Sequence, residues 1–398
     1  MKLLAQLSKR SLAATAAIVL VLSSSVCGQS PPPLASNKPA ERQLNMLVLG
    51  DSIMWGQGLN EQHKAWYQVK SWLKENTNRD VRETVEAHSG ALVGVNDVPP
   101  LNDSPPDGEV SSAVPTVNHE VDRALKVFVD SSQVDLVLVD GCINDVDVRN
   151  LLNAANSSDD VKRMAAERCG MPMQALLGRV VSSFSRAHVI VTGYFPIISE
   201  KTPNSLLMKA MARMFYQPGP KPAKLKQKDL RERLIAVSRA WYQASNAALG
   251  NAVKKTNEEL AAKGSRQRVL FVEIPFPPEY SFNAPETRLW GFNASFLRKL
   301  LAVLTLGRVT LKTNDERQRQ RVTSCNDQYR RPANETDSQK GTREMRRMLC
   351  RYASLGHPNR KGSAIYADAI VGKLKSLITE TGWLRDSQTG ARPATAAP

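Results

Sequence analysis

The sequence predicts an α/β protein with a central parallel sheet of about five strands, covered by helices on both faces. Five short runs are predicted to be strands, and several of them are almost wholly apolar, as expected for strands buried on both sides; they are residues 46–49, 81–87, 134–139, 187–192 and 269–274. Amphipathic stretches that fit helices separate these runs; the clearest are residues 66–76, 117–129, 161–183 and 230–262. Because strand, helix and strand alternate along the chain, we expect neighbouring strands to be parallel.

Two segments, near residues 199–230 and 275–350, are longer than a minimal sheet needs. Loops of this length inside a compact domain are usually functional or partly ordered by their own structure. We therefore expect one domain over residues 45–385, with helix-rich insertions around the mouth of its site. The polar end of the chain, residues 386–398, is predicted to be a disordered tail.

The N-terminus has the pattern of an export signal. Basic residues precede an apolar run at residues 12–22, which predicts a signal peptide over residues 1–28 and a secreted or periplasmic protein. The run is shorter than the roughly 20 residues of a transmembrane helix, so we expect no membrane span. Lipoprotein anchoring through Cys27 is the less favoured alternative, because Val26 is larger than a lipidation signal prefers. Residues 29–44 are Pro-rich and predict a linker.

Four cysteines remain after the signal: Cys142, Cys169, Cys325 and Cys350. An even number in an exported chain predicts two disulfides, for which three connectivities exist. Proximity in the sequence favours Cys142 with Cys169 and Cys325 with Cys350. A zinc site is the alternative, but the chain has no C-x-x-C pair and its spacings do not fit one.

The net charge of +16 is concentrated in two stretches. Residues 201–270 hold 15 Lys and Arg against 4 Asp and Glu, and residues 308–351 hold 12 against 6. Few aromatic residues are interleaved and no reading motif for nucleic acid occurs, so no specific nucleic-acid binding is expected. Solvated helix faces with a general attraction for an anionic surface or polymer are the favoured interpretation.

Ser52 and His357 are the candidate catalytic pair. Ser52 directly follows the first apolar strand in a tight Gly50-Asp51-Ser52 turn, where the carboxyl ends of parallel strands gather functional groups. A serine hydroxyl becomes nucleophilic only when a neighbouring imidazole takes its proton. Among five histidines, His357 stands out because it lies in a turn just ahead of a C-terminal helix.

An acyl-transfer site also needs donors for the oxyanion that develops on the attacked carbonyl. Candidates are the backbone N–H groups of Ser52 and Gly90 and the side-chain amide of Asn144, each at the end of a predicted strand. Each has a structural alternative, since Gly90 could be a turn glycine and Asn144 could cap a helix.

Together these motifs resemble those of the SGNH (GDSL-type) hydrolase superfamily. The residues that carry the resemblance are Gly50-Asp51-Ser52, Trp55-Gly56-Gln57-Gly58, Gly90, Asn144-Asp145 and His357-Pro358-Asn359. The resemblance implies a flavodoxin-like three-layer α/β/α sandwich that hydrolyses esters without a metal or cofactor. It implies Ser52 as nucleophile, His357 as base, and Ser52, Gly90 and Asn144 as the oxyanion hole. Asp51, Asp145 and Ser354 are neighbours that could support them.

The chain departs from the family pattern at two positions. Cys142 stands two residues before Asn144, where the family usually has Gly, and Ser354 stands where the family places the triad acid. We therefore predict a Ser52–His357 dyad whose imidazole is oriented by a main-chain oxygen near Ser354. A carboxylate supplied by an insertion is the less favoured alternative.

The predicted function is a secreted serine esterase that hydrolyses a carboxylic ester of a lipid, an acetylated carbohydrate or another acyl compound through an acyl-enzyme on Ser52. An acyltransferase using the same site is one alternative. A non-catalytic polyanion-binding module with this fold is another. An aromatic cluster could line an acyl pocket or pack a core; its members are Phe276, Tyr280, Phe282, Trp290 and Phe292.

Overall fold

A computed structural model describes residues 43–94, 108–110, 116–205, 208–209, 212, 215–216, 229–293 and 311–384. The predicted signal peptide, nearly all of the predicted linker and the predicted tail lie outside these residues. In the described ranges no helix is both long and apolar enough to cross a membrane.

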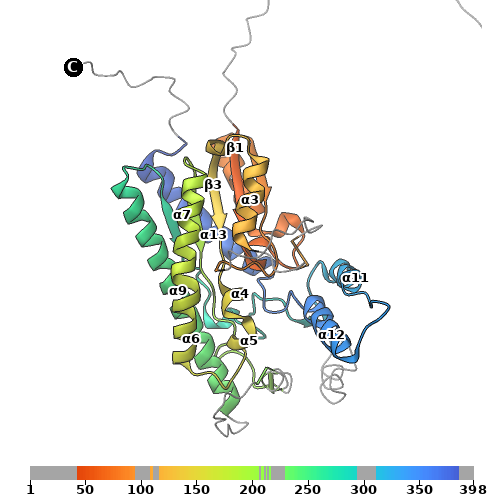
Figure 1. Cartoon of the computed structure of the whole chain (residues 1–398). Helices are drawn as coiled ribbons and strands as arrows, with labels where there is room; N and C mark the ends of the chain where they lie inside the picture. The colour runs from red at the N-terminus through yellow and green to blue at the C-terminus, as the bar shows by residue number, and fades with distance from the viewer. Residues whose placement is uncertain are drawn as a thin grey trace, which may run out of the picture. The chain divides into compact units, whose positions relative to one another are not determined.

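Five parallel strands form the central sheet, as predicted (Figure 1). They are β1 (Leu44–Leu49), β2 (Val81–Val85), β3 (Val134–Val139), β4 (His188–Thr192) and β5 (Val269–Val272). Their order across the sheet is β2-β1-β3-β4-β5, which is the flavodoxin-like order. The most buried strands are the central ones, because they are covered by helices on both faces.

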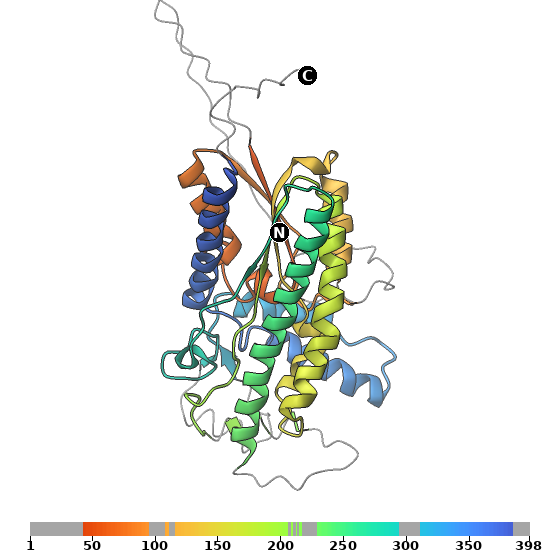
Figure 2. The ribbon, with the colours of Figure 1, turned by 90° about the vertical axis from the view of Figure 1, so that its left-hand side faces the viewer.

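Helices cover both faces of the sheet, which completes the predicted three layers (Figure 2). One layer holds α2 (Ala65–Thr77) and the dark blue α13 (Arg360–Thr381), which pack against each other. The other layer holds α3 (Val117–Val127), α7 (Met171–Ser183) and the long α9 (Leu230–Ala262). Apolar side chains of both layers join those of the strands in one core.

Several predicted boundaries differ from the structure. β1 begins two residues earlier than predicted, and β2 ends at Val85 rather than at residue 87. The helix predicted over residues 161–183 is three consecutive segments: α6 (Ser158–Ala165), a π-helical turn η3 (Ala166–Gly170) and α7. The apolar spacing of the sequence continues through the π turn, so the sequence did not reveal where α6 ends and α7 begins.

The described part of the second predicted insertion contains several short elements, and its buried residues Phe276, Phe282 and Leu289 belong to the main core. It contains the short helix η5 (Pro278–Tyr280), an antiparallel pair of β6 (Phe292–Asn293) and β7 (Lys312–Thr313), and two helices, α11 (Gln318–Gln328) and α12 (Asp337–Arg351). The remaining short helices of the described residues are α1 (Ser52–Trp55), η1 (Glu61–His63), η2 (Ser131–Gln133), which directly precedes β3, α4 (Ile143–Val146) and α5 (Val148–Leu151).

Both predicted disulfides are present. Cys142 pairs with Cys169, and their Cα atoms are 5.1 Å apart. Cys325 pairs with Cys350 across 5.9 Å, which joins α11 to α12. The first bond therefore fixes the segment after β3 to the π turn, and the second closes the insertion.

Candidate active site

The turn after β1 presents Ser52 at the sheet edge. Gly50 adopts a φ of +127°, and a Cβ there would come within 2.1 Å of the Asp140 carboxylate, so only glycine fits. Asp51 caps α1 by accepting a hydrogen bond from the Ile53 N–H at 2.8 Å. Ser52 is the first residue of α1, so its own N–H has no acceptor within the helix.

The structure brings Ser52 and His357 together across 305 residues of sequence. Ser52 Oγ and His357 Nε2 are 2.7 Å apart. The histidine loop is fixed on both sides, because the Trp290 N–H donates to the His357 carbonyl at 2.8 Å and Asn359 caps α13. The pair therefore has the geometry that proton transfer from hydroxyl to imidazole requires.

The environment of His357 favours the neutral imidazole. Burial lowers its pKa from 6.5 to about 4, and the positive charge of Arg321 acts in the same direction. The backbone carbonyls of Leu355 and Ser354 and the negative charge of Asp315 oppose this change. At neutral pH the ring is thus uncharged and can accept a proton.

Among the described residues, no carboxylate makes a hydrogen bond with the second ring nitrogen of His357. Its Nδ1 is buried and makes no hydrogen bond with the described residues. Ser354, in the place of the triad acid, instead donates from Oγ to Asp315 at 2.8 Å and accepts from Arg321 at 2.9 Å. The backbone carbonyls of Leu355 and Ser354 lie close enough to raise the pKa of the ring. Orientation of the imidazole by a main-chain oxygen stays a prediction, because Nδ1 makes no hydrogen bond with the described residues.

Gly90 and Asn144 lie at the strand ends on either side of Ser52. Gly90 follows β2 and Asn144 lies in α4 after β3, and β1 lies between these two strands. Among the described residues no hydrogen bond uses the N–H of Gly90. The Asn144 amide donates to the Ala91 carbonyl at 3.0 Å, which ties the two loops together.

Cys142 and Asp145 shape the segment that carries Asn144. Cys142 has a φ of +106°, a conformation that favours glycine, and its disulfide to Cys169 holds it in place. The Asp145 carboxylate accepts from the N–H groups of Val93 at 3.0 Å and Gly94 at 2.7 Å. Asp145 therefore supports the loop after β2 and makes no contact with His357 or Ser52.

A group of buried acids lies beneath the Ser52 turn. Asp140 accepts from the Asp51 N–H at 2.7 Å, Glu120 accepts from the Gly50 N–H at 2.6 Å, and the Tyr194 hydroxyl donates to Asp51 at 2.7 Å. Burial raises the pKa of Asp51 to about 6 and the pKa values of Asp140 and Glu120 well above their ordinary range. These bonds fix the backbone on which Ser52 stands.

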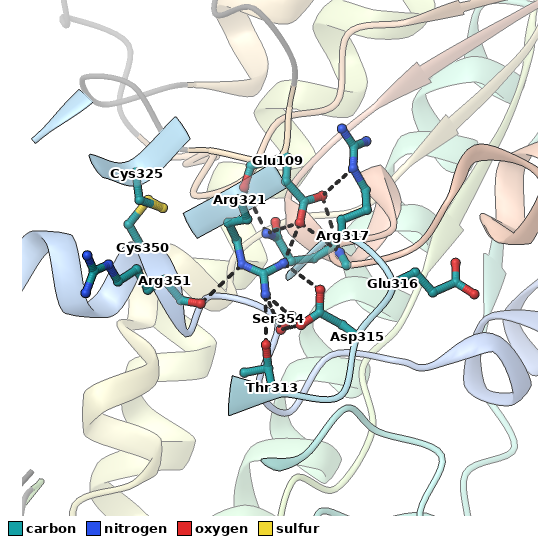
Figure 3. A network of polar contacts seen from close by, with 12 residues as sticks. Glu109, Thr313, Asp315, Glu316, Arg317, Arg321, Cys325, Cys350, Arg351 and Ser354 are labelled. Carbon is teal, nitrogen blue, oxygen red and sulfur yellow. Dashed lines mark hydrogen bonds and ion pairs between the residues drawn. A yellow bond between two sulfur atoms is a disulfide. The ribbon is translucent and has the colours of Figure 1, made fainter. Parts of the chain in front are cut away.

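Three further residues of the site were not predicted from the sequence: Glu109, Asp315 and Arg321 (Figure 3). The Arg321 side chain is fully buried and pairs with Glu109 at 2.7 Å and with Asp315 at 2.6 Å. Arg321 lies in a basic stretch whose other members look the same in sequence, so no local signal marks it. Its burial depends on partners that only the fold brings near.

The predicted aromatic cluster is divided between two environments. Phe276 contacts Phe195 and Tyr280 and lines a cleft of about 460 Å³ beside α9. Phe282 and Trp290 are buried in the protein. The residues that line the cleft do not include Ser52 or His357. In the described ranges, no group of three or more His, Cys, Asp or Glu side chains could hold a metal ion.

Neither a protein-family model nor a curated protein sequence matches the chain. The extracellular lipase of Streptomyces rimosus is 14% identical with a TM-score of 0.37, over 62% of this chain and 87% of the lipase. Phospholipase A1 of Streptomyces albidoflavus is 12% identical with a TM-score of 0.38, over 63% and 88%. A carbohydrate acetylesterase of Sinorhizobium meliloti is 13% identical with a TM-score of 0.28, over 61% and 87%. At these identities the similarity concerns the fold alone.

Proposed function

We propose that this protein is a serine esterase that hydrolyses carboxylic esters through an acyl-enzyme on Ser52. The observation that carries the proposal is the 2.7 Å contact between Ser52 Oγ and the buried His357 Nε2. A hydroxyl beside a neutral imidazole is the minimum arrangement for nucleophilic acyl transfer.

In the proposed first step, His357 Nε2 takes the proton of Ser52 while Oγ attacks the ester carbonyl. The carbonyl π pair moves onto oxygen, and the N–H groups of Ser52 and Gly90 and the Asn144 amide stabilise this oxyanion. When the oxyanion collapses, the bond to the alcohol breaks and His357 returns the proton to it. Water then repeats the sequence on the acyl-enzyme, releasing the acid and restoring Ser52.

We propose that the enzyme works outside the cytoplasm. Two disulfides support this, because such bonds persist in oxidising compartments.

The substrate of the enzyme would be an ester of a lipid, an acetylated carbohydrate or another acyl compound. An acyltransferase would use the same residues, with a sugar hydroxyl in place of water. The basic insertions would attract an anionic surface or polymer. A protein that binds such a polymer without catalysing a reaction is the alternative that is not an enzyme.

A series of p-nitrophenyl esters from acetate to palmitate tests the proposal and ranks acyl lengths in one experiment. Each ester is assayed with the wild type and with Ser52→Ala, and again with a sugar acceptor present. We expect hydrolysis that Ser52→Ala abolishes while circular dichroism stays unchanged. Acyl transfer that exceeds hydrolysis would favour the acyltransferase, and no turnover of any ester would favour the binding module.

A further inference from the structure

Glu109 holds the turn that begins at Ser52. Its carboxylate accepts from Trp55 Nε1 and from the Gly58 N–H, both at 3.1 Å, and its backbone carbonyl accepts from Gln57 Nε2 at 2.8 Å. The Gln57 N–H in turn donates to the Ser52 carbonyl at 2.9 Å. The path from Ser52 to Gly58 is therefore anchored on one buried carboxylate.

The same turn packs directly on the histidine loop. Gly58 has a φ of +81°, and a Cβ there would lie 2.9 Å from Cβ of Asp315 and 3.0 Å from Cβ of Ser354. The Gly58 carbonyl accepts from the Glu316 N–H at 3.0 Å. The segment between β7 and α11 thus lies against both halves of the candidate site.

Arg321 is the group in which these contacts meet (Figure 3). It pairs with Glu109 on the side of the Ser52 turn and with Asp315 and Ser354 on the side of the histidine loop. Its Nε also donates to the Arg351 carbonyl at 3.3 Å, at the end of α12. The Ser354 carbonyl accepts from the backbone N–H of His357 at 3.0 Å, so the chain of contacts reaches the main chain of the residue that carries the imidazole.

We propose that Arg321 is a positioning residue of this site, and that its guanidinium ties the Ser52 turn, through Glu109, to the His357 loop, through Asp315 and Ser354. The inference rests on the proposed function for its kinetic consequence. It gives α11 a part in holding the two halves of the site together, because Arg321, which joins the two loops, comes from α11. A planar guanidinium suits this task because it donates in fixed directions to several acceptors at once.

The proposal has a second consequence, because Arg321 is one of the charges that set the pKa of His357. Arg321 lowers the pKa of His357 and Asp315 raises it. Glu109 is paired to Arg321, and the nearby Glu316 and Arg360 pair with each other. Removing the Arg321 charge would leave the Asp315 carboxylate without this cation, while Glu109 would keep its longer ion pair with Arg317, at 4.0 Å. The pKa of His357 should then rise.

Arg321→Gln tests the proposal, with Arg343→Gln as its control. Arg343 pairs with the well-buried Glu335 in the same insertion but touches neither the Ser52 turn nor the histidine loop. We would measure kcat and KM with p-nitrophenyl butyrate and titrate the His357 imidazole by NMR, with His357→Asn to assign its signal. For Arg321→Gln we expect kcat to fall roughly 10²-fold, KM to change little, and the pKa of His357 to rise. Arg343→Gln should leave all three near wild type.

Asp315→Asn is the second variant, in case Arg321→Gln does not fold. It keeps the shape of the side chain and leaves Arg321 paired with Glu109, so we expect a folded protein with kcat lowered about 10-fold and no rise in the pKa of His357. An unchanged kcat in either folded variant would overturn the proposal, as would equal losses in Arg343→Gln. The NMR titration needs no substrate. A wild type that hydrolyses no ester would therefore count against the proposed function, while the His357 titration would still decide the role of Arg321.

Discussion

The protonation state of His357 decides at which pH the proposed base works. Because burial lowers its pKa to about 4, we expect kcat/KM to lose activity along an acidic limb near pH 4, and not near the ordinary histidine value of about 6.5. A pH–rate profile with a p-nitrophenyl ester measures the limb. Asp51 has a pKa of about 6, so Asp51→Asn is measured in parallel to separate its titration. A wild-type limb above pH 6 that Asp51→Asn also keeps would contradict the assignment.

The same shift makes a prediction for stability. The pKa of His357 is lower in the folded chain than in the unfolded chain, so the unfolded chain binds the proton first as the pH falls. This group therefore removes stability between about pH 6.5 and pH 4. Circular dichroism measured across that pH range shows whether the protein unfolds. Activity that is lost while the spectrum stays unchanged is then due to protonation of His357.

Asn144 has two possible uses, and one substitution separates them. Asn144→Ala should lower kcat by roughly 10²- to 10³-fold if the amide stabilises the oxyanion. It should also cost about 1 kcal/mol of stability, because the bond to the Ala91 carbonyl is lost. Asn150→Ala is the control, since Asn150 donates to the Val146 carbonyl in the same way and stands outside the proposed site. Equal kcat in the two variants would reduce Asn144 to a structural role.

At the scale of the elements, one buried carboxylate joins two segments. It belongs to Asp315, between β7 and α11, and it accepts a hydrogen bond from Ser354 in the histidine loop. Ser354→Asp alone would place a second carboxylate beside it and should destabilise the fold by about 3 kcal/mol, although the motif resemblance puts a triad acid at position 354. Ser354→Asp combined with Asp315→Ser keeps a single carboxylate and should recover most of that loss. Urea unfolding of the wild type and of these two variants measures this. A stable, fully active Ser354→Asp single variant would contradict this prediction. It would show that the site can hold a second carboxylate beside Asp315 without loss of stability.

Elements whose signal is local were predictable from the sequence. β1, β3, β4 and β5 were found because each is a short, mainly apolar run between polar loops, and α9 was found because its apolar spacing persists over its 33 residues. The end of β2 was predicted two residues late, because Glu86 and Ala87 continue the alternation of polar and apolar residues beyond Val85. The π turn between α6 and α7 leaves the apolar spacing intact, so it could not be seen.

At the scale of the whole molecule, strand order explains why the candidate site could be predicted in part. Ser52, Gly90 and Asn144 each follow a strand, and a parallel sheet gathers such residues at one edge. Arg321 and Glu109 are 212 residues apart and meet only through the insertion. Nothing in a basic helix distinguishes a buried arginine from its solvated neighbours, so this part of the site required the structure.

Covalent labelling of Ser52 tests the central claim most directly. A p-nitrophenyl alkylphosphonate should inactivate the wild type with one phosphonate per chain, because attack by Ser52 Oγ expels p-nitrophenolate and leaves a stable adduct. Peptide mapping should place the adduct on Ser52, and His357→Asn should slow the labelling by orders of magnitude while the protein stays folded. Labelling of another residue, or equal labelling rates in the wild type and His357→Asn, would contradict the proposed mechanism.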